Sequence, residues 1–280
     1  MFKDDLLAGR RVLVTGGGTG LGRSITARYM SLGADVVICG RREEALRKTA
    51  AELAASCRGS IECVRCDIRD PEAVDGMLSA IWERGALDIL VNNAAGNFTA
   101  PTESLSYRAV DAVLGIVLQG TSYVTLGCGK RWLAESHAGI VLSIVTTYAF
   151  TGSAFVVPSA MAKAGVLAMT RSLAVEWGGR GIRLNAIAPG PFPTEGAWDR
   201  LVPKPELAKA FEEKNPLRRA GRHEELADLA AFLVSDQAAY INGECVTIDG
   251  GEWLQGAGQF NFLGRMMSPQ DWQDAKARRK

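Results

Sequence analysis

Short runs of β-branched residues alternate with longer helical patterns along most of the 280-residue chain. The runs fall at residues 11–15, 35–39, 61–66, 88–92, 139–144, 182–188 and 245–248 and are too short to favour helices. Helical patterns occupy residues 21–32, 42–56, 71–84, 107–135, 158–177 and 224–233. This alternation predicts an α/β fold, a doubly wound parallel sheet of about seven strands with helices on both faces.

The chain shows no internal repeat, low-complexity linker or shift in composition, which predicts a single domain over residues 1–280. Six prolines between residues 189 and 216 prevent one continuous helix there. We expect residues 189–219 to form a substrate-covering loop with a short helix, although an ordinary surface excursion would give the same pattern. Residues 252–280 follow the last predicted strand as a C-terminal extension.

Charge and cysteine content exclude several classes of protein. Lys and Arg total 32 against 31 Asp and Glu, which gives no electrostatic reason to expect nucleic acid or an anionic membrane as the main partner. The sequence lacks a signal-peptide pattern and any run of eighteen apolar residues, so we expect a soluble cytoplasmic protein. The six cysteines are scattered as in a reducing compartment, and the isolated pair Cys63 and Cys66 does not predict a metal site.

A glycine-rich turn follows the first predicted strand and begins the first helix. Glycines allow positive φ angles and a close approach of the backbone to a pyrophosphate, whose charge the helix N-terminus stabilises. A tight turn is the alternative for the glycines alone, but the strand and helix on either side favour a Rossmann-type dinucleotide site. Its predicted cofactor-binding residues are Gly16, Gly17, Gly18, Thr19, Gly20 and Leu21.

The end of the second predicted strand indicates which dinucleotide is bound. It lacks the acidic residue that receives the ribose hydroxyls of NAD(H), and Arg41 and Arg42 stand there instead. Two guanidinium groups can pair with a 2′-phosphate, which favours NADPH as the cofactor. Alternatively, Arg42 only begins a solvated helix. Asp67, after the third strand, is a candidate acceptor for the adenine amino group.

Over about residues 8–251 the chain resembles the short-chain dehydrogenase/reductase family. The resemblance rests on the glycine turn, Asn92-Asn93-Ala94-Ala95-Gly96, Ala188-Pro189-Gly190-Pro191, Ile241-Asn242-Gly243 and Asp249-Gly250-Gly251. It implies that Asn93, Ala94 and Gly96 lie on the adenosine side of the cofactor, and that Pro189, Gly190, Pro191 and Phe192 form the turn at the nicotinamide. It also implies a homo-oligomer, specifically a tetramer.

The usual tyrosine of this family is missing. None of the five tyrosines stands four residues before a lysine, and Ser159 and Lys163 occupy that spacing. A serine hydroxyl is a much poorer acid than a tyrosine, which argues against ordinary interconversion of alcohol and ketone. The protein is therefore either catalytically silent or a catalyst of a different hydride transfer.

One branch with this replacement, the mitochondrial-type 2,4-dienoyl-CoA reductases, resembles the chain more closely. The shared segments are Asn93-Ala94-Ala95-Gly96-Asn97-Phe98, Thr147-Tyr148, Thr151-Gly152-Ser153 and Phe155-Val156-Val157-Pro158-Ser159-Ala160. The resemblance implies that Asn97 and Tyr148 hold a substrate thioester, that Lys163 holds the nicotinamide ribose, and that Ser159 supports them. Two neutral donors would stabilise the charge of a dienolate formed by hydride addition at C5, and water would then protonate the α-carbon to give a 3-enoyl-CoA.

The same resemblance suggests how an acyl-CoA is held. It implicates Arg41, Arg69, Phe98, Ser106 and Arg200 as further substrate contacts, although single arginines are also common surface residues. Gln119 stands where the wider family commonly has asparagine, which leaves the proton route open. The alternatives to a dienoyl-CoA reductase are another NADP(H)-dependent reductase of an enoyl-CoA or carbonyl compound, and a silent NADPH-binding protein.

Overall fold

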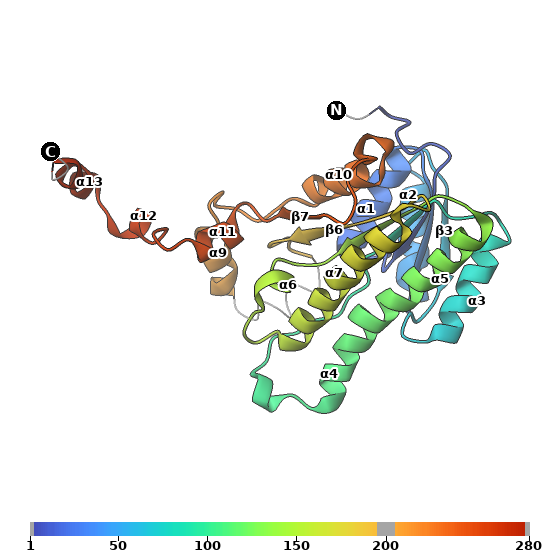
Figure 1. Ribbon diagram of the computed structural model, residues 1–280, viewed down its shortest axis with the longest axis horizontal. Helices are drawn as coiled ribbons and strands as arrows, with labels where there is room; N and C mark the ends of the chain where they lie inside the picture. Colours follow the sequence, from blue (N-terminus) through green and yellow to red (C-terminus); the bar gives the residue numbers. More distant parts are fainter. Residues whose placement is uncertain (1–2, 195–204, 278–280) are drawn as a thin grey trace.

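The computed structural model describes residues 3–194 and 205–277, and its centre is one parallel sheet (Figure 1). Seven strands lie in the order β3-β2-β1-β4-β5-β6-β7, and each pairs in parallel with its neighbours. They are β1 (Arg11–Thr15), β2 (Asp35–Gly40), β3 (Ile61–Arg65), β4 (Ile89–Asn92), β5 (Gly139–Ile144), β6 (Ile182–Pro189) and β7 (Cys245–Ile248). The predicted fold class is confirmed.

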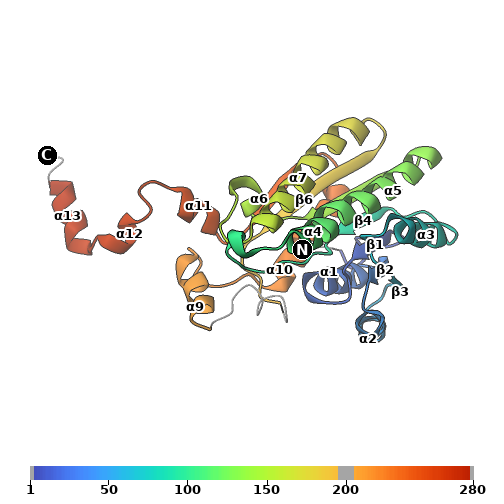
Figure 2. The same ribbon diagram turned by 90° about the horizontal axis from the view of Figure 1, so that it is seen from below.

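Helices cover both faces of the sheet (Figure 2). They are α1 (Gly20–Ser31), α2 (Glu43–Ala54), α3 (Pro71–Trp82), α4 (Tyr107–Leu114), α5 (Gly120–Glu135), α6 (Tyr148–Thr151), α7 (Val157–Gly178), α9 (Pro205–Lys214), α10 (His223–Val234), α11 (Glu252–Ala257), α12 (Leu263–Met266) and α13 (Pro269–Ala277). A π-helical turn, Gly115–Gln119, joins α4 to α5, so the predicted helix at 107–135 is present with one irregular turn. Residues 195–204 of the predicted loop lie outside the described residues, and α9 is its helical part.

The two faces of the sheet have separate hydrophobic cores, because neighbouring residues of a strand point to opposite sides. Val12 and Val14 of β1 pack beneath α1 and α10, whereas Leu13 belongs to the core beneath α3, α5 and α7. In the second core, Trp132 and Trp177 are almost fully buried. The strands therefore read as continuous apolar runs, as expected for a sheet covered on both faces.

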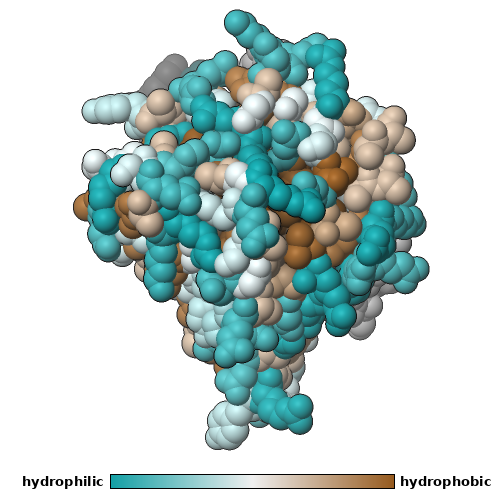
Figure 3. All heavy atoms as spheres, turned by 90° about the vertical axis from the view of Figure 1, so that its right-hand side faces the viewer, coloured by the Kyte–Doolittle hydropathy of each residue, from teal (hydrophilic) through white to brown (hydrophobic). Residues whose placement is uncertain are grey.

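The helical segment Tyr107–Glu135 is apolar enough, by length and composition, to cross a membrane, and 39% of its most apolar stretch is buried. α5 packs against α3 and α7, and its residues Val124, Cys128 and Trp132 are inaccessible to solvent. These contacts make it a core helix. The face of the molecule in Figure 3 is mostly hydrophilic, with apolar side chains gathered right of its centre.

The strand order places a crevice at the carboxyl ends of β1 and β4. The chain runs outward from β1 to β2 and β3, and outward in the other direction from β4, so the connections leave these two ends uncovered. Ligands of open α/β sheets bind at such a switch point. At the other extreme, α12 and α13 extend away from the body (Figures 1 and 2).

Candidate active site

A pocket of about 1300 Å³ follows the carboxyl ends of the strands. It begins at Arg41 and Arg42 after β2, passes the glycine turn after β1, and reaches Lys163 on α7 and Pro189 at the end of β6. Ligand pockets commonly measure about 300–1000 Å³. The volume therefore leaves room for a second ligand beside a dinucleotide.

The glycine turn has the backbone that a pyrophosphate site needs. Gly16 and Gly20 have φ angles of +66° and +54°, which side-chain-bearing residues rarely adopt. A Cβ on Gly22 would clash with the carbonyl oxygen of Gly16, so the first turn of α1 can come this close to the loop only with glycine there. Gly16, Gly18, Thr19, Gly20 and Leu21 line the pocket.

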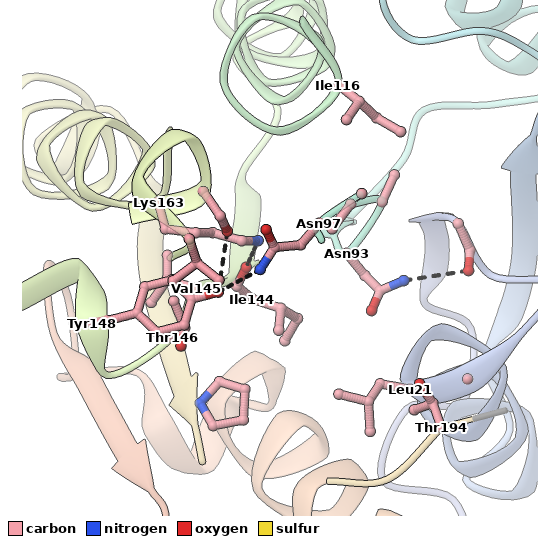
Figure 4. Close-up of a pocket in the computed structure, with 18 of the residues that line it drawn as sticks. Leu21, Asn93, Asn97, Ile116, Ile144, Val145, Thr146, Tyr148, Lys163 and Thr194 are labelled. Carbon is pink, nitrogen blue, oxygen red and sulfur yellow. Dashed lines mark hydrogen bonds between the residues drawn. The ribbon is translucent and has the colours of Figure 1, made fainter. Parts of the chain in front are cut away.

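Gly17 and Asn93 support the turn from behind. A Cβ on Gly17 would clash with the side chain of Ile38 on β2, so this glycine allows the loop to pack on the sheet. The Asn93 amide donates hydrogen bonds to the carbonyl oxygens of Thr15, at 3.0 Å, and Gly16 (Figure 4). Asn93, Ala94 and Gly96 also line the pocket. The sequence element after β4 is thus tied directly to the glycine turn.

Two exposed arginines and one ion pair stand at the predicted adenosine end. Arg41 and Arg42 line the pocket, and Arg42 is also the residue before the first turn of α2. Asp67 lines it too, but its carboxylate accepts a hydrogen bond of 2.9 Å from Nε of Arg69. This bond holds the pKa of Asp67 below its usual value. The structure therefore pairs two residues that the sequence suggests as separate ligand contacts.

Asn97, Tyr148 and Ser159 form one hydrogen-bonded cluster in the pocket. The Asn97 amide donates to the hydroxyl oxygen of Tyr148 over 3.2 Å, and the hydroxyl groups of Tyr148 and Ser159 are 3.1 Å apart. The backbone N–H of Phe98 donates to Oδ1 of Asn97, which turns the amide nitrogen toward Tyr148. Three elements supply the cluster: the loop after β4, the short helix α6 and the first turn of α7.

Lys163 lies one helical turn after Ser159 on the same face of α7. Its side chain is 8% exposed, and its ammonium group donates to the backbone carbonyl of Ile144 at the end of β5 (Figure 4). Burial lowers the pKa of Lys163 to about 8. The lysine is thus a fixed hydrogen-bond donor in the wall of the pocket.

The turn after β6 lies at the other end of the pocket. Pro189, Gly190 and Pro191 line it, whereas the ring of Phe192 is buried in the core and packs on Gly221. A Cβ on Gly190 would come within 2.7 Å of the Asp249 side chain, so this turn lies directly on the segment that precedes α11.

Several predicted substrate contacts do not line this pocket. Phe98 packs with Val113 and Val117, Ser106 caps the N-terminus of α4, and Arg69 is held by Asp67. Gln119, which the sequence leaves without a role, is exposed and does not line the pocket, whereas Ile116, one turn earlier, lines it. Arg200 lies outside the described residues.

One wall of the pocket was not predicted from the sequence. Phe211 and Lys214 on α9 and Glu252, Trp253, Gly256 and Ala257 on α11 line it. The only available signal was the spacing of Glu252, Trp253, Gly256 and Ala257, which places them on one face of a helix. Phe155 also lines the pocket and is one of the few described residues other than glycine with a positive φ angle, +65°.

These features are those of an oxidoreductase that binds a nicotinamide dinucleotide. The family model described as "Enoyl-(Acyl carrier protein) reductase" matches residues 16–252. The chain belongs to the short-chain dehydrogenase/reductase family.

Named relatives and solved structures agree with this assignment. The chain is 45% identical to "Probable 2,4-dienoyl-CoA reductase 3 [(3E)-enoyl-CoA-producing]" of Caenorhabditis elegans, over 90% of this chain and 83% of that protein. It is 43% identical to the "Probable 2,4-dienoyl-CoA reductase [(2E)-enoyl-CoA-producing]" of Bacillus subtilis, over 88% of this chain and 97% of the relative. A putative NAD(P)-dependent gluconate 5-dehydrogenase from Beutenbergia cavernae, solved with NADP bound at low occupancy, superposes with a TM-score of 0.84 at 34% identity, over 90% of this chain and 99% of that one.

Proposed function

We propose that the protein is an NADPH-dependent 2,4-dienoyl-CoA reductase that acts in the oxidation of unsaturated fatty acids. The observation that carries the proposal is the hydrogen-bonded cluster of Asn97, Tyr148 and Ser159 beside the buried Lys163. The names of the relatives from Caenorhabditis elegans and Bacillus subtilis support the same substrate class.

The residues of the pocket fit the proposed cofactor. Positive φ angles at Gly16 and Gly20 open the glycine turn toward a pyrophosphate, and Arg41 and Arg42 supply two cations for a 2′-phosphate. Lys163 would hold the nicotinamide ribose through its ammonium group. When bound, NADPH supplies the hydride for the reduction.

Asn97 and Tyr148 would act on the carbonyl oxygen of the substrate thioester. Addition of a hydride at C5 sends the negative charge through the conjugated system to that oxygen, which makes a dienolate. The Asn97 amide and the Tyr148 hydroxyl both donate hydrogen bonds, and they already lie 3.2 Å apart, so one oxygen atom can accept from both. Ser159 can donate to Tyr148, which leaves the tyrosine proton free for the substrate.

The reaction is completed at the α-carbon. A proton from water would give a 3-enoyl-CoA, and no strongly acidic side chain is needed for that step. We also propose a homotetramer, which the family resemblance implies, and a cytoplasmic location, which is an expectation from the sequence.

The test is the consumption of NADPH with 2,4-hexadienoyl-CoA and 2,4-decadienoyl-CoA, with chromatographic assignment of the double bond in the product. Tyr148→Phe and Asn97→Ala should each lower kcat on the order of 10²–10³-fold, the usual loss of one oxyanion donor. NADPH binding, followed by its fluorescence, should persist in both variants. Equal turnover in the wild type and both variants would contradict the mechanism.

The two alternatives predict other results in the same assay. Another reductase of the family would leave dienoyl-CoA untouched and reduce a ketone or a 2-enoyl-CoA. A silent protein would bind NADPH and reduce none of these compounds. Because neither Asn97 nor Tyr148 is required for binding the cofactor, their hydrogen-bonded arrangement favours catalysis over silence.

A further inference from the structure

The wall formed by α9 and α11 is not accounted for by the cofactor or by the thioester donors. Phe211 on α9 and Trp253 and Ala257 on α11 give it an apolar surface. Its cation, Lys214, lies 3.5 Å from the carboxylate of Glu252, so the two charges neutralise each other. Such a surface suits a hydrocarbon better than the phosphates of coenzyme A.

The wall is held firmly against the catalytic end of the sheet. Asn215, which is 2% exposed, directly follows α9 and donates a hydrogen bond of 2.7 Å to the backbone carbonyl of Asp249. The Asp249 carboxylate in turn accepts hydrogen bonds from the backbone N–H groups of Gly251 and Trp253 at the start of α11. Because Gly190 lies on Asp249, α11 keeps a fixed position relative to the turn after β6.

An aromatic contact joins the wall to the thioester donors. The ring of Trp253 lies 5.4 Å, centre to centre, from the ring of Phe150 on α6. Phe150 follows Tyr148 by two residues on the same short helix. The apolar surface therefore begins beside the element that carries Tyr148, the proposed donor to the thioester oxygen.

We propose that α9 and α11 form the acyl-chain subsite and that Gly256 sets the length of chain that the enzyme accepts; this rests on the proposed reductase function. Gly256 lines the pocket one turn after Trp253. A Cβ built on it meets no atom within 4 Å, so there is open space where a side chain would begin. It would occupy space that the distal carbons of the acyl chain use.

The experiment compares kcat/KM for 2,4-hexadienoyl-CoA and 2,4-decadienoyl-CoA in the wild type and in Gly256→Phe. Burial of one methylene is worth about fourfold in kcat/KM, and the longer substrate has four more of them. The ratio of kcat/KM, decadienoyl over hexadienoyl, should fall at least about tenfold in the variant. Gly76→Phe is the control, because Gly76 in α3 also has free space around its Cβ position but does not line the pocket.

The outcomes separate this inference from the proposed function. A wild type that reduces neither substrate refutes the function. A wild type that reduces both, with the same ratio in Gly256→Phe as in Gly76→Phe, refutes the subsite and leaves the function standing. If Gly256→Phe unfolds, Trp253→Ala serves instead. This variant should lower kcat/KM more for 2,4-decadienoyl-CoA than for 2,4-hexadienoyl-CoA.

Discussion

Lys163 should make the stability of the protein depend on pH in a way that Lys163→Met removes. In the folded chain burial lowers its pKa from 10.5 to about 8. Below pH 8 the lysine is charged in both states, and the folded state carries the full cost of a buried charge, about 3 kcal/mol. Between pH 8 and 10.5 the folded state loses the proton first, so the wild type gains stability relative to the variant as the pH rises.

The size of the effect follows from the two pKa values. Linkage gives a relative gain for the wild type of about 2 kcal/mol between pH 7 and pH 9.5. The lost hydrogen bond from the neutral amine to the Ile144 carbonyl lowers the stability of Lys163→Met by about 1 kcal/mol at every pH. The variant should therefore be about 2 kcal/mol more stable than the wild type at pH 7 and about as stable as the wild type at pH 9.5.

Urea denaturation of both proteins at the two pH values measures this difference. Lys130→Met is the matched control, because Lys130 is an exposed lysine on α5, and its difference from the wild type should not change with pH. A stability difference for Lys163→Met that is the same at pH 7 and pH 9.5 would show that the lysine is not desolvated. The reasoning about its burial would then be refuted.

Two further predictions concern the cofactor and the fold. Arg41→Ala should lower the ratio of kcat/KM for NADPH to kcat/KM for NADH about tenfold, which corresponds to the loss of one charge-assisted hydrogen bond. Arg108→Ala, on α4, is the control and should leave this ratio unchanged. An unchanged ratio in Arg41→Ala would remove Arg41 from the proposed 2′-phosphate site. Asp70→Ala should lower the free energy of unfolding, measured by urea denaturation, by about 1 kcal/mol, because the Asp70 side chain accepts hydrogen bonds from the backbone N–H groups of Glu72 and Ala73 at the start of α3. Unchanged stability would mean that solvent replaces these hydrogen bonds.

Most of the fold could be predicted because its strands and helices have distinct local patterns. The runs at residues 11–15, 139–144 and 245–248 coincide with β1, β5 and β7, and the other strands differ from the prediction by one residue. The helix α6 could not be found in this way. Four residues are too few for helical periodicity, and Tyr148–Thr151 owes its shape to tertiary contacts with α7.

Gly16, Arg41, Asn93 and Pro189 could be predicted because they share one geometric property. Each ends or follows a strand of a parallel sheet, and all carboxyl ends of such a sheet lie at one edge, so position along the chain is enough to bring them together. Ser159 and Lys163 were predicted instead from their spacing, which places them on one face of α7. It is harder to predict from the sequence whether a charged residue binds a ligand or pairs with a charged neighbour. Asp67 and Arg69 stand two residues apart in a turn, and the structure joins them to each other.

The wall of α9 and α11 could not be predicted from local sequence patterns. Its position depends on the hydrogen bond between Asn215 and the Asp249 carbonyl, which joins residues 34 positions apart. Asparagine is common in loops and helix ends, so Asn215 alone does not indicate this contact. The substitution Gly256→Phe tests whether this wall binds the acyl chain. Because there is free space around the Cβ position of Gly256, an effect on the substrate can be separated from an effect on folding. The position of the residues proposed to select among substrates thus depends on tertiary contacts, whereas the position of those proposed to hold the cofactor depends on strand ends.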